Sequence, residues 1–326
     1  MSSTPILDVR GLSVVYASAR GPVLAVDDVS FTVGAGEFVG IVGESGCGKS
    51  TLLFAIAQLL SPPAEVSGGD VLFKGESLVG MSGGELSALR WRDFSVVMQS
   101  AMNALNPVKS IAAQYTDALK AHDRSMSKAR IRERSAEVLR LVGIDAAHLD
   151  SYPHQLSGGM RQRAMIAMAL LFTPDLVIMD EPTSALDVVA QRSLMVQIKE
   201  LQEQLGFAVV FVTHDMSLVS HFSNRLIVMY AGQIAEAGPT RSVFDSPKHP
   251  YSQGLLDAFP SIRGERLPLT GIPGSPPDLG DLPTGCRFHP RCPQVMDECR
   301  TTPPELYPAD DVLARCLLHA PDVARV

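Results

Sequence analysis

The segment GESGCGKS, residues 43–50, combines glycines with a lysine and a hydroxyl side chain at fixed spacing. The pattern is glycine, any four residues, then Gly-Lys-Ser, between a predicted buried strand and a predicted helix. Glycines let consecutive backbone N–H groups point at one phosphate, and the helix N-terminus adds partial positive charge. We therefore predict a P-loop in which Lys49 reaches the β- and γ-phosphates and the Ser50 hydroxyl binds Mg²⁺. The predicted nucleotide-binding residues of this loop are Gly43, Ser45, Gly46, Cys47, Gly48, Lys49, Ser50 and Thr51. Cys47 is interpreted as a small residue that fits the loop rather than as a redox switch.

A second acidic motif, LVIMDEP at residues 176–182, places two carboxylates at the end of an apolar strand. Asp180 is expected to hold the Mg²⁺, and Glu181 to orient or deprotonate a water near the γ-phosphate. A general base of this kind contributes roughly 10²–10⁴ in rate. An Asp-Glu pair after a strand can also cap a helix, but its occurrence downstream of a P-loop favours catalysis.

These motifs need a framework of alternating strands and helices. Two β-rich segments, residues 6–16 and 25–33, flank a Gly-Pro turn and predict a hairpin. Three apolar runs are typical of buried strands: EFVGIV, LVIMD and FAVVFVTHD. Helical spacing covers residues 50–60 and much of 110–143, with Gly143 as a stop and the basic side chains on a solvated face. The alternation indicates an α/β core.

Composition limits the class of protein. The chain has 326 residues, enough for two domains, with 46% hydrophobic residues and a formal net charge of −7. The acidic balance disfavours nucleic acid as a partner. The N-terminus lacks the pattern of a signal peptide, and no apolar run approaches the 18 residues of a membrane span. We expect a soluble, cytosolic protein whose partners can still be in a membrane.

Between the two phosphate motifs lies LSGGMRQR, residues 156–163, and with it the chain resembles the ATP-binding subunits of ABC transporters. The resemblance covers about residues 5–255. It implies a P-loop ABC ATPase core in the α/β class, with an antiparallel β subdomain and a helical subdomain at about 100–165. It also implies ATP and Mg²⁺ as cofactors. The matching residues are Gln99 as a catalytic and Mg²⁺-binding glutamine, His214 as the switch histidine, Tyr16 as the aromatic that stacks on adenine, and Ser157, Gly158 and Gly159 as the signature.

The same resemblance implies a head-to-tail dimer with each ATP between two subunits. Ser157 and Gly159 would then act on the partner's ATP. The residues that act on the chain's own ATP would be Lys49, Asp180, Glu181 and His214. The signature has Met160 where glutamine is commonest. We expect no loss of function, because the contacts attributed to this motif come from the serine hydroxyl and backbone N–H groups.

The last quarter of the chain is dense in proline and glycine, and we place a domain boundary near 255–260. This divides the chain into an ABC domain, 1–255, and a small irregular C-terminal module, 256–326. KHPYSQGLLDAFP, at 248–260, and GCRFHPRCP resemble the extension of dipeptide, oligopeptide and nickel importer ATPases. The resemblance implies an importer with two membrane permeases, an external substrate-binding protein and a second, related ATPase, with this chain peripheral on the cytoplasmic face of the inner membrane.

Four of the five cysteines lie in this tail: Cys286, Cys292, Cys299 and Cys316. A reducing compartment disfavours disulfides, and the spacing lacks the CxxC pairs of zinc ribbons. Thiolates on proline-stiffened loops suit a [4Fe–4S] cluster, as some members of the resembled subfamily carry. Zinc and unligated thiols stay open, and His289 and His319 are near enough in sequence to be substitute ligands. The favoured role of such a site is structural, because a small module with few apolar residues needs cross-linking to be stable.

Two other classes compete with a transport ATPase. A soluble ABC ATPase that remodels ribosomes or nucleic acid often has two cassettes or a long coiled coil, and this chain has neither. An iron–sulfur redox sensor would rest on the tail alone, whereas Glu181 and His214 argue for turnover. The sequence does not specify the cargo, or whether the dimer partner is a copy or a relative.

Overall fold

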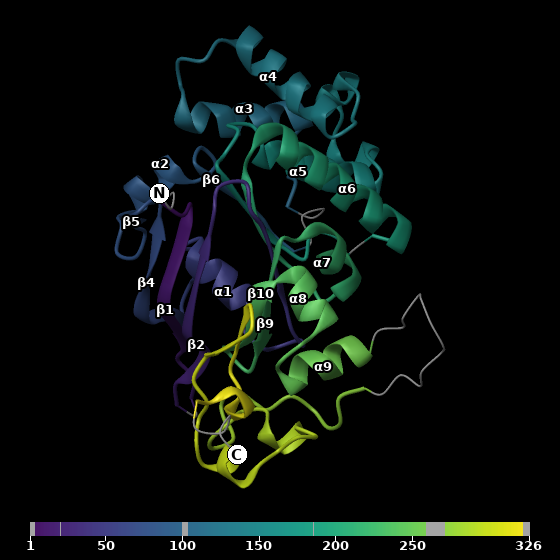
Figure 1. The fold of residues 1–326 in the computed structure, drawn as a ribbon. Helices are drawn as coiled ribbons and strands as arrows, with labels where there is room; N and C mark the ends of the chain where they lie inside the picture. Colours follow the sequence, from purple (N-terminus) through teal and green to yellow (C-terminus); the bar gives the residue numbers. More distant parts are fainter. Residues whose placement is uncertain (1–3, 20, 100–103, 185, 259–270, 322–326) are drawn as a thin grey trace. The chain divides into compact units, whose positions relative to one another are not determined.

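The structure is a computed structural model that describes residues 4–19, 21–99, 104–184, 186–258 and 271–321 (Figure 1). The chain forms two compact units, and each is described by itself. Unit 1 contains residues 1–7, 33–38 and 73–212, and unit 2 contains residues 8–32, 39–72 and 213–326. The predicted start of the helical subdomain, near 100, and the segment after the predicted boundary at 255 fall partly outside the described residues. The domain limits therefore stay a prediction.

Unit 1 combines a parallel sheet with helices. Its elements are β5 (Glu76–Ser77), α2 (Gly83–Leu89), β6 (Phe94–Val97), α3 (Ile111–His122), α4 (Lys128–Leu141), two 3₁₀ turns, η2 (Ala146–Asp150) and η3 (Pro153–Gln155), α5 (Gly158–Ala169), β7 (Leu176–Asp180), α6 (Val188–Leu205) and β8 (Ala208–Val212). β7 lies between β6 and β8 and is parallel to both. Every residue of β7 and β8 is buried, as the apolar runs predict for strands covered on both faces.

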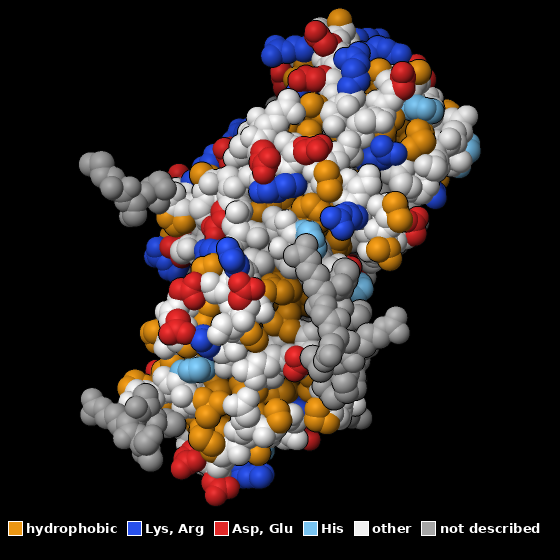
Figure 2. Space-filling model, turned by 45° about the vertical axis from the view of Figure 1, so that its right-hand side comes forward, with side chains coloured by type: hydrophobic (Ala, Val, Ile, Leu, Met, Phe, Trp, Pro, Cys, Tyr) orange, Lys and Arg blue, Asp and Glu red, His pale blue; other side chains and the backbone are white. Residues whose placement is uncertain are grey.

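The helices α3, α4 and α5 pack on one another in unit 1. α4 begins after Ser127, whose hydroxyl caps the Arg130 N–H, and it ends just before Gly143, which has a φ of +69°. The buried Tyr115 of α3 donates to the Ala164 carbonyl of α5 at 2.6 Å. In Figure 2, Lys and Arg side chains stand among Asp and Glu side chains over this helical region at the top. The predicted helices and their solvated charged face are confirmed.

Unit 2 holds two sheets. Its elements are β1 (Leu7–Tyr16), β2 (Val23–Val33), β3 (Phe38–Val42), α1 (Lys49–Ile56), β4 (Ala64–Phe73), α7 (Met216–Phe222), β9 (Arg225–Tyr230), β10 (Gln233–Pro239), α8 (Thr240–Asp245), α9 (Pro250–Asp257), β11 (Tyr307–Ala309) and β12 (Val312–Ala314), with 3₁₀ turns η4 (His289–Arg291), η5 (Asp297–Arg300) and η6 (Leu317–His319). In one sheet the order is β2-β1-β4, so the two predicted hairpin strands are neighbours. In the other it is β11-β12-β10-β9-β3, with β3 parallel to β9.

The C-terminal module is mostly turns, as its composition predicts, but it also contains a hairpin that the sequence did not reveal. β11 and β12 pair antiparallel, and β12 pairs with β10 through Glu236↔Ala314 and Ala237↔Leu313. Three-residue strands give too short an alternation to be recognised in sequence. This pairing makes the module an extension of the sheet that contains β3 and β9.

Candidate functional site

The P-loop follows β3 in unit 2 and runs into α1, as its motif requires. Gly43, Gly46 and Gly48 all have positive φ, at 152°, 80° and 101°. A Cβ added at Gly43 would lie 2.3 Å from the Met229 carbonyl oxygen, and one added at Gly48 would lie 2.3 Å from that of Ala25. These two positions accept only glycine without a backbone shift, which explains the spacing of the motif.

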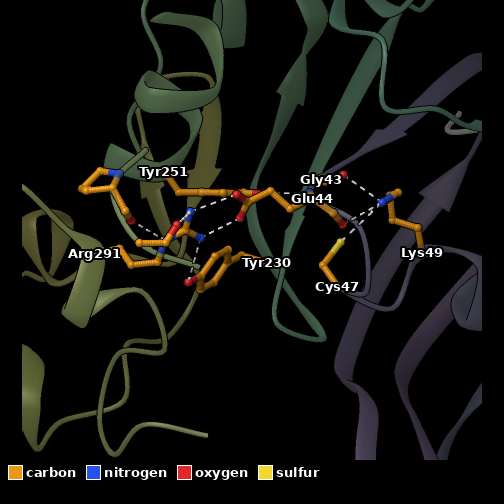
Figure 3. Close-up of polar contacts among 9 residues, drawn as sticks. Gly43, Glu44, Cys47, Lys49, Tyr230, Tyr251 and Arg291 are labelled. Atoms are coloured by element: carbon orange, nitrogen blue, oxygen red, sulfur yellow. Dashed lines mark hydrogen bonds and ion pairs between the residues drawn. The ribbon is translucent and has the colours of Figure 1, made fainter. Parts of the chain in front are cut away.

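Lys49 is the first residue of α1 and is buried beneath the loop. Its ammonium donates to the carbonyl oxygens of Gly43, at 2.8 Å, and Glu44, at 2.9 Å (Figure 3). Cys47 lies beside it, with Sγ 3.8 Å from Nζ. Burial raises the pKa of the Cys47 thiol, which keeps it protonated and unreactive. This supports the interpretation of Cys47 as a small residue that fits the loop.

Tyr16 ends β1 close to the P-loop helix in unit 2. Its hydroxyl lies 3.2 Å from the Thr51 hydroxyl, and the tyrosine is half-buried. Ser50 is half-buried beside Thr51 in the first turn of α1. The structure thus brings the predicted adenine-stacking tyrosine to the same helix that carries the predicted Mg²⁺ ligand.

The acidic motif and the predicted glutamine meet in unit 1. Asp180 is the buried last residue of β7, and Glu181 follows with a φ of +43°, a region that few residues other than glycine adopt. Gln99 lies just after β6, the strand that pairs with β7. Its amide donates to the Glu181 carboxylate at 3.2 Å. Parallel strands bring the two side chains to one edge of the sheet, and the strained backbone at Glu181 is typical of a functional residue.

The signature motif forms the start of α5 in unit 1. Ser157 is the N-cap, and its exposed hydroxyl accepts from the Met160 N–H at 3.3 Å. Gly158 and Gly159 supply the next N–H groups at the positive end of the helix. Only the backbone of Met160 takes part in the cap contact, so the departure from glutamine leaves this geometry intact. Further along α5, Gln162 donates to the Pro182 carbonyl beyond the acidic motif.

His214 precedes α7 in unit 2 and is exposed. Its neighbours fix its position: Thr213 donates its N–H to the Ile41 carbonyl of β3 at 3.2 Å, and Asp215 caps α7 through the Ser217 N–H. The histidine therefore projects from a short, well-anchored turn next to the strand that leads into the P-loop.

One pair near the P-loop escaped the sequence analysis. Glu44 forms a two-point ion pair with Arg291, a residue of the C-terminal module almost 250 positions later, at 2.7 and 2.9 Å. The carboxylate holds the pKa of the Arg291 guanidinium above its usual value. The acidic side chain of Glu44, at a variable position of the P-loop, could have indicated an ion pair. The sequence alone does not identify Arg291 as its partner.

Cys316 lies within electrostatic reach of the other three tail thiols. Burial, and to a lesser extent the neighbouring thiols Cys286, Cys292 and Cys299, raises the pKa of Cys316 to about 12. The Cys286 N–H donates to the Cys299 carbonyl at 2.8 Å. In the part of the chain that the structure describes, however, no three His, Cys, Asp or Glu side chains are grouped so that they could hold a metal ion.

The two histidines considered as substitute ligands are engaged elsewhere. A ring nitrogen of His289 lies 3.0 Å from the Cys286 carbonyl oxygen, and one of His319 lies 3.0 Å from that of Lys248.

Known proteins are similar to this chain over most of its length. Residues 26–184 match the family model described as ABC transporter, and residues 235–299 match the one described as oligopeptide/dipeptide transporter, C-terminal region. The chain is 44% identical over 301 residues to the oligopeptide transport ATP-binding protein OppD of Salmonella typhimurium, covering 92% of this chain and 89% of that protein. It is 41% identical over 323 residues to the dipeptide transport ATP-binding protein DppD of Escherichia coli, covering 98% of each.

The chain belongs to the ABC transporter ATPases. Among solved structures, it resembles the ATP-binding cassette MJ0796 bound to ADP and Pi, with a TM-score of 0.64 and 29% identity over 72% of this chain and 99% of that one. It also resembles cbiO1 from Clostridium perfringens, with a TM-score of 0.65 and 28% identity over 75% of this chain and 92% of that one. The predicted ABC ATPase fold is confirmed.

This ABC ATPase hydrolyses ATP as the energy-coupling subunit of an importer, and the soluble ribosome- or nucleic-acid-remodelling class is not favoured. ATP and Mg²⁺ follow from the family. Subunits of this kind work with membrane permeases and dimerise as cassettes. Within the described ranges, no helix has both the length and the apolarity to cross a bilayer.

Proposed function

We propose that this ATPase powers the uptake of peptides or related small solutes. The observation that carries the proposal is the union in one chain of an ABC cassette and a C-terminal region that matches the oligopeptide/dipeptide transporter model. The relatives are named oligopeptide and dipeptide transport ATP-binding proteins, and the similarity covers 89% and 98% of their lengths, which supports the same cargo class.

Each part of the proposed catalytic site has a chemical task. The P-loop amides and Lys49 bind the β- and γ-phosphates, Ser50 and Asp180 hold Mg²⁺, and Glu181 is the general base. Gln99 contributes to the Mg²⁺ shell. Its side-chain amide donates a 3.2 Å hydrogen bond to the Glu181 carboxylate, which supports a role in orienting that base.

His214 senses the γ-phosphate, and the Tyr16 ring stacks on the adenine. The exposure of His214 and the contact of Tyr16 with the P-loop helix support these roles. Ser157 and Gly159 act on the ATP of the opposite cassette. The N–H groups at the positive, N-terminal end of α5 support anion binding there.

The proposed assembly contains two membrane permeases, a second ATPase related to this one and an extracytoplasmic substrate-binding protein. The chain would lie peripherally on the cytoplasmic face of the inner membrane, and nucleic acid is not among its partners. Support comes from the family of membrane transport subunits and from the dimeric cassettes among similar structures.

Uptake of a labelled dipeptide and a labelled tripeptide by cells that carry the transporter tests the proposal. Deleting this chain should abolish uptake, and the wild-type gene should restore it. A Lys49→Ala gene should not, because the phosphates lose their buried cation. Full uptake with Lys49→Ala, or peptide uptake indifferent to the deletion, would refute the proposed cargo and coupling.

We further propose that the tail cysteines hold a [4Fe–4S] cluster with a structural role. The support is their spacing on proline-stiffened turns and the 2.8 Å hydrogen bond from the Cys286 N–H to the Cys299 carbonyl, which brings two of the four residues together. Bound to Cys286, Cys292, Cys299 and Cys316, the cluster would cross-link a module with few strands. Protein purified without oxygen should contain iron and acid-labile sulfide in roughly equal amounts. Colourless protein with one zinc or with no metal contradicts the cluster.

A further inference from the structure

Glu44 is a carboxylate inside a loop that binds a triphosphate. Because like charges repel, an unpaired carboxylate at this position would weaken the binding of the phosphates. Its backbone also matters: the Glu44 carbonyl accepts from the Lys49 ammonium at 2.9 Å, and its N–H donates to the Tyr251 hydroxyl at 2.9 Å. The position of Glu44 therefore influences both the charge and the shape of the loop.

Arg291 supplies the opposite charge from the C-terminal module. Its side chain is only 6% exposed and meets the Glu44 carboxylate through both terminal nitrogens, at 2.7 and 2.9 Å. Its Nε donates to the Pro273 carbonyl at 2.8 Å, and the guanidinium carbon lies 5.9 Å from the centre of the Tyr230 ring. A two-point pair on a fixed guanidinium sets the direction as well as the charge of its partner.

The side chains of this cluster point to opposite sides of the loop. In Figure 3 the Glu44 side chain reaches toward Arg291 and Tyr230, whereas Lys49 lies on the other side, against the carbonyl of Gly43. Tyr230 and Tyr251 pack against each other with ring centres 4.6 Å apart and ring planes tilted by 57°, so this side of the loop is closely packed. The arrangement turns the one acidic side chain of the P-loop away from its lysine.

We propose that Arg291 is a positioning residue for ATP: it neutralises Glu44 and holds its carboxylate away from the phosphate-binding amides. The C-terminal module is then part of the nucleotide-binding machinery. The inference deepens the ATPase function of the chain and requires neither the peptide cargo nor the cluster.

The test measures the Kd of a fluorescent ATP analogue with Mg²⁺ for the full-length chain. Arg291→Met removes the charge and keeps the length, and we expect the Kd to rise about tenfold, the effect of losing one charged hydrogen-bonded pair. The rise should shrink in high salt, because salt screens the exposed negative charge. Arg291→Lys keeps the charge but not the two-point contact, so its Kd should lie between those of wild type and Arg291→Met.

The decisive variant is the double substitution Arg291→Met with Glu44→Gln. Because it also removes the uncompensated carboxylate, its Kd should return to within about threefold of wild type. Glu44→Gln alone, which retains the arginine that packs the loop, should bind at least as tightly as wild type. Arg241→Met, on the exposed surface of α8 with a side chain 92% accessible, is the matched control and should change nothing.

Three results would overturn the inference: an unchanged Kd for Arg291→Met, a double variant as weak as Arg291→Met, or a tenfold loss in Glu44→Gln. The second of these would mean that Arg291 only supports the fold. If Arg291→Met does not fold, Glu44→Gln still tests the charge argument. This variant retains Arg291 and its contacts with Pro273 and Tyr230. Failure of wild-type protein to bind ATP would instead refute the ATPase function itself.

Discussion

Replacing Tyr251 by phenylalanine removes a single buried oxygen from the closely packed side of the P-loop. The Tyr251 side chain is fully buried, and its hydroxyl accepts the Glu44 N–H at 2.9 Å. Phenylalanine keeps the ring contacts with Tyr230 and Phe288, at 4.6 and 5.4 Å between centres. The change thus isolates one hydrogen bond to the P-loop backbone.

The expected loss of stability depends on how deeply the Glu44 N–H, which loses its acceptor in this variant, is buried. A fully buried donor that loses its acceptor costs about 1–3 kcal/mol; Glu44 is half-buried, so we expect the free energy of unfolding to fall by about 1–2 kcal/mol. The Glu44 carbonyl also holds Lys49, so part of that cost should appear in ATP binding. We expect the Kd for ATP to rise about threefold to tenfold, because 1.4 kcal/mol corresponds to a factor of ten.

Tyr115→Phe is the matched control. Tyr115 is equally buried and donates to the Ala164 carbonyl at 2.6 Å, but it lies among the helices of unit 1. Denaturant unfolding and ATP titration of both variants separate the two effects. Both should lose similar stability, and only Tyr251→Phe should lose ATP affinity. Equal affinity in the two variants would refute the claim that this hydroxyl positions the P-loop.

Three other variants test separate parts of the account. Glu181→Gln should bind ATP normally and lose at least about a hundredfold in kcat, because the amide cannot act as a general base; near-normal hydrolysis would exclude that role. Gly48→Ala should weaken ATP binding more than tenfold in titrations, because its Cβ would lie 2.3 Å from the Ala25 carbonyl oxygen and the backbone would have to shift; an unchanged Kd would contradict the loop geometry. Burial lowers the pKa of His249 to about 4. The folded protein therefore holds this histidine neutral, and the free energy of unfolding is highest above pH 6.5 and decreases as the pH falls toward 4. His249→Asn keeps an acceptor for the Tyr251 N–H but does not titrate. The difference in the free energy of unfolding between pH 7 and pH 4 should therefore be about 3 kcal/mol smaller in this variant than in wild type. An unchanged difference would mean that His249 does not titrate in this way.

The sequence predicted those parts of the molecule that local pattern controls. β7 and β8 follow from apolar runs, α4 from its spacing and its glycine stop, and the P-loop from glycines that no other residue can replace. The family resemblance named Gln99 as a site residue and the acidic motif named Glu181, and the parallel pairing of β6 with β7 gives a physical reason for the contact between them.

Contacts between residues far apart in the sequence could not be predicted from local pattern. Glu44 and Arg291 are each ordinary in their own segment, and only the folded chain shows that they share two hydrogen bonds. The short strands β11 and β12 exist because β10 offers an edge to pair with, which is a tertiary cause rather than a local propensity. The hydrogen bond from the Cys286 N–H to the Cys299 carbonyl likewise depends on turns that composition marks only as irregular.

The most direct test of the central claim is the identity of the proteins that this chain binds in its own cells. The tagged chain would be purified from membranes solubilised in mild detergent, and its partners identified by mass spectrometry. The account predicts two polytopic membrane proteins together with a second ABC ATPase, which would also establish a mixed dimer. Recovery with ribosomes or nucleic acid, and without any membrane protein, would contradict it.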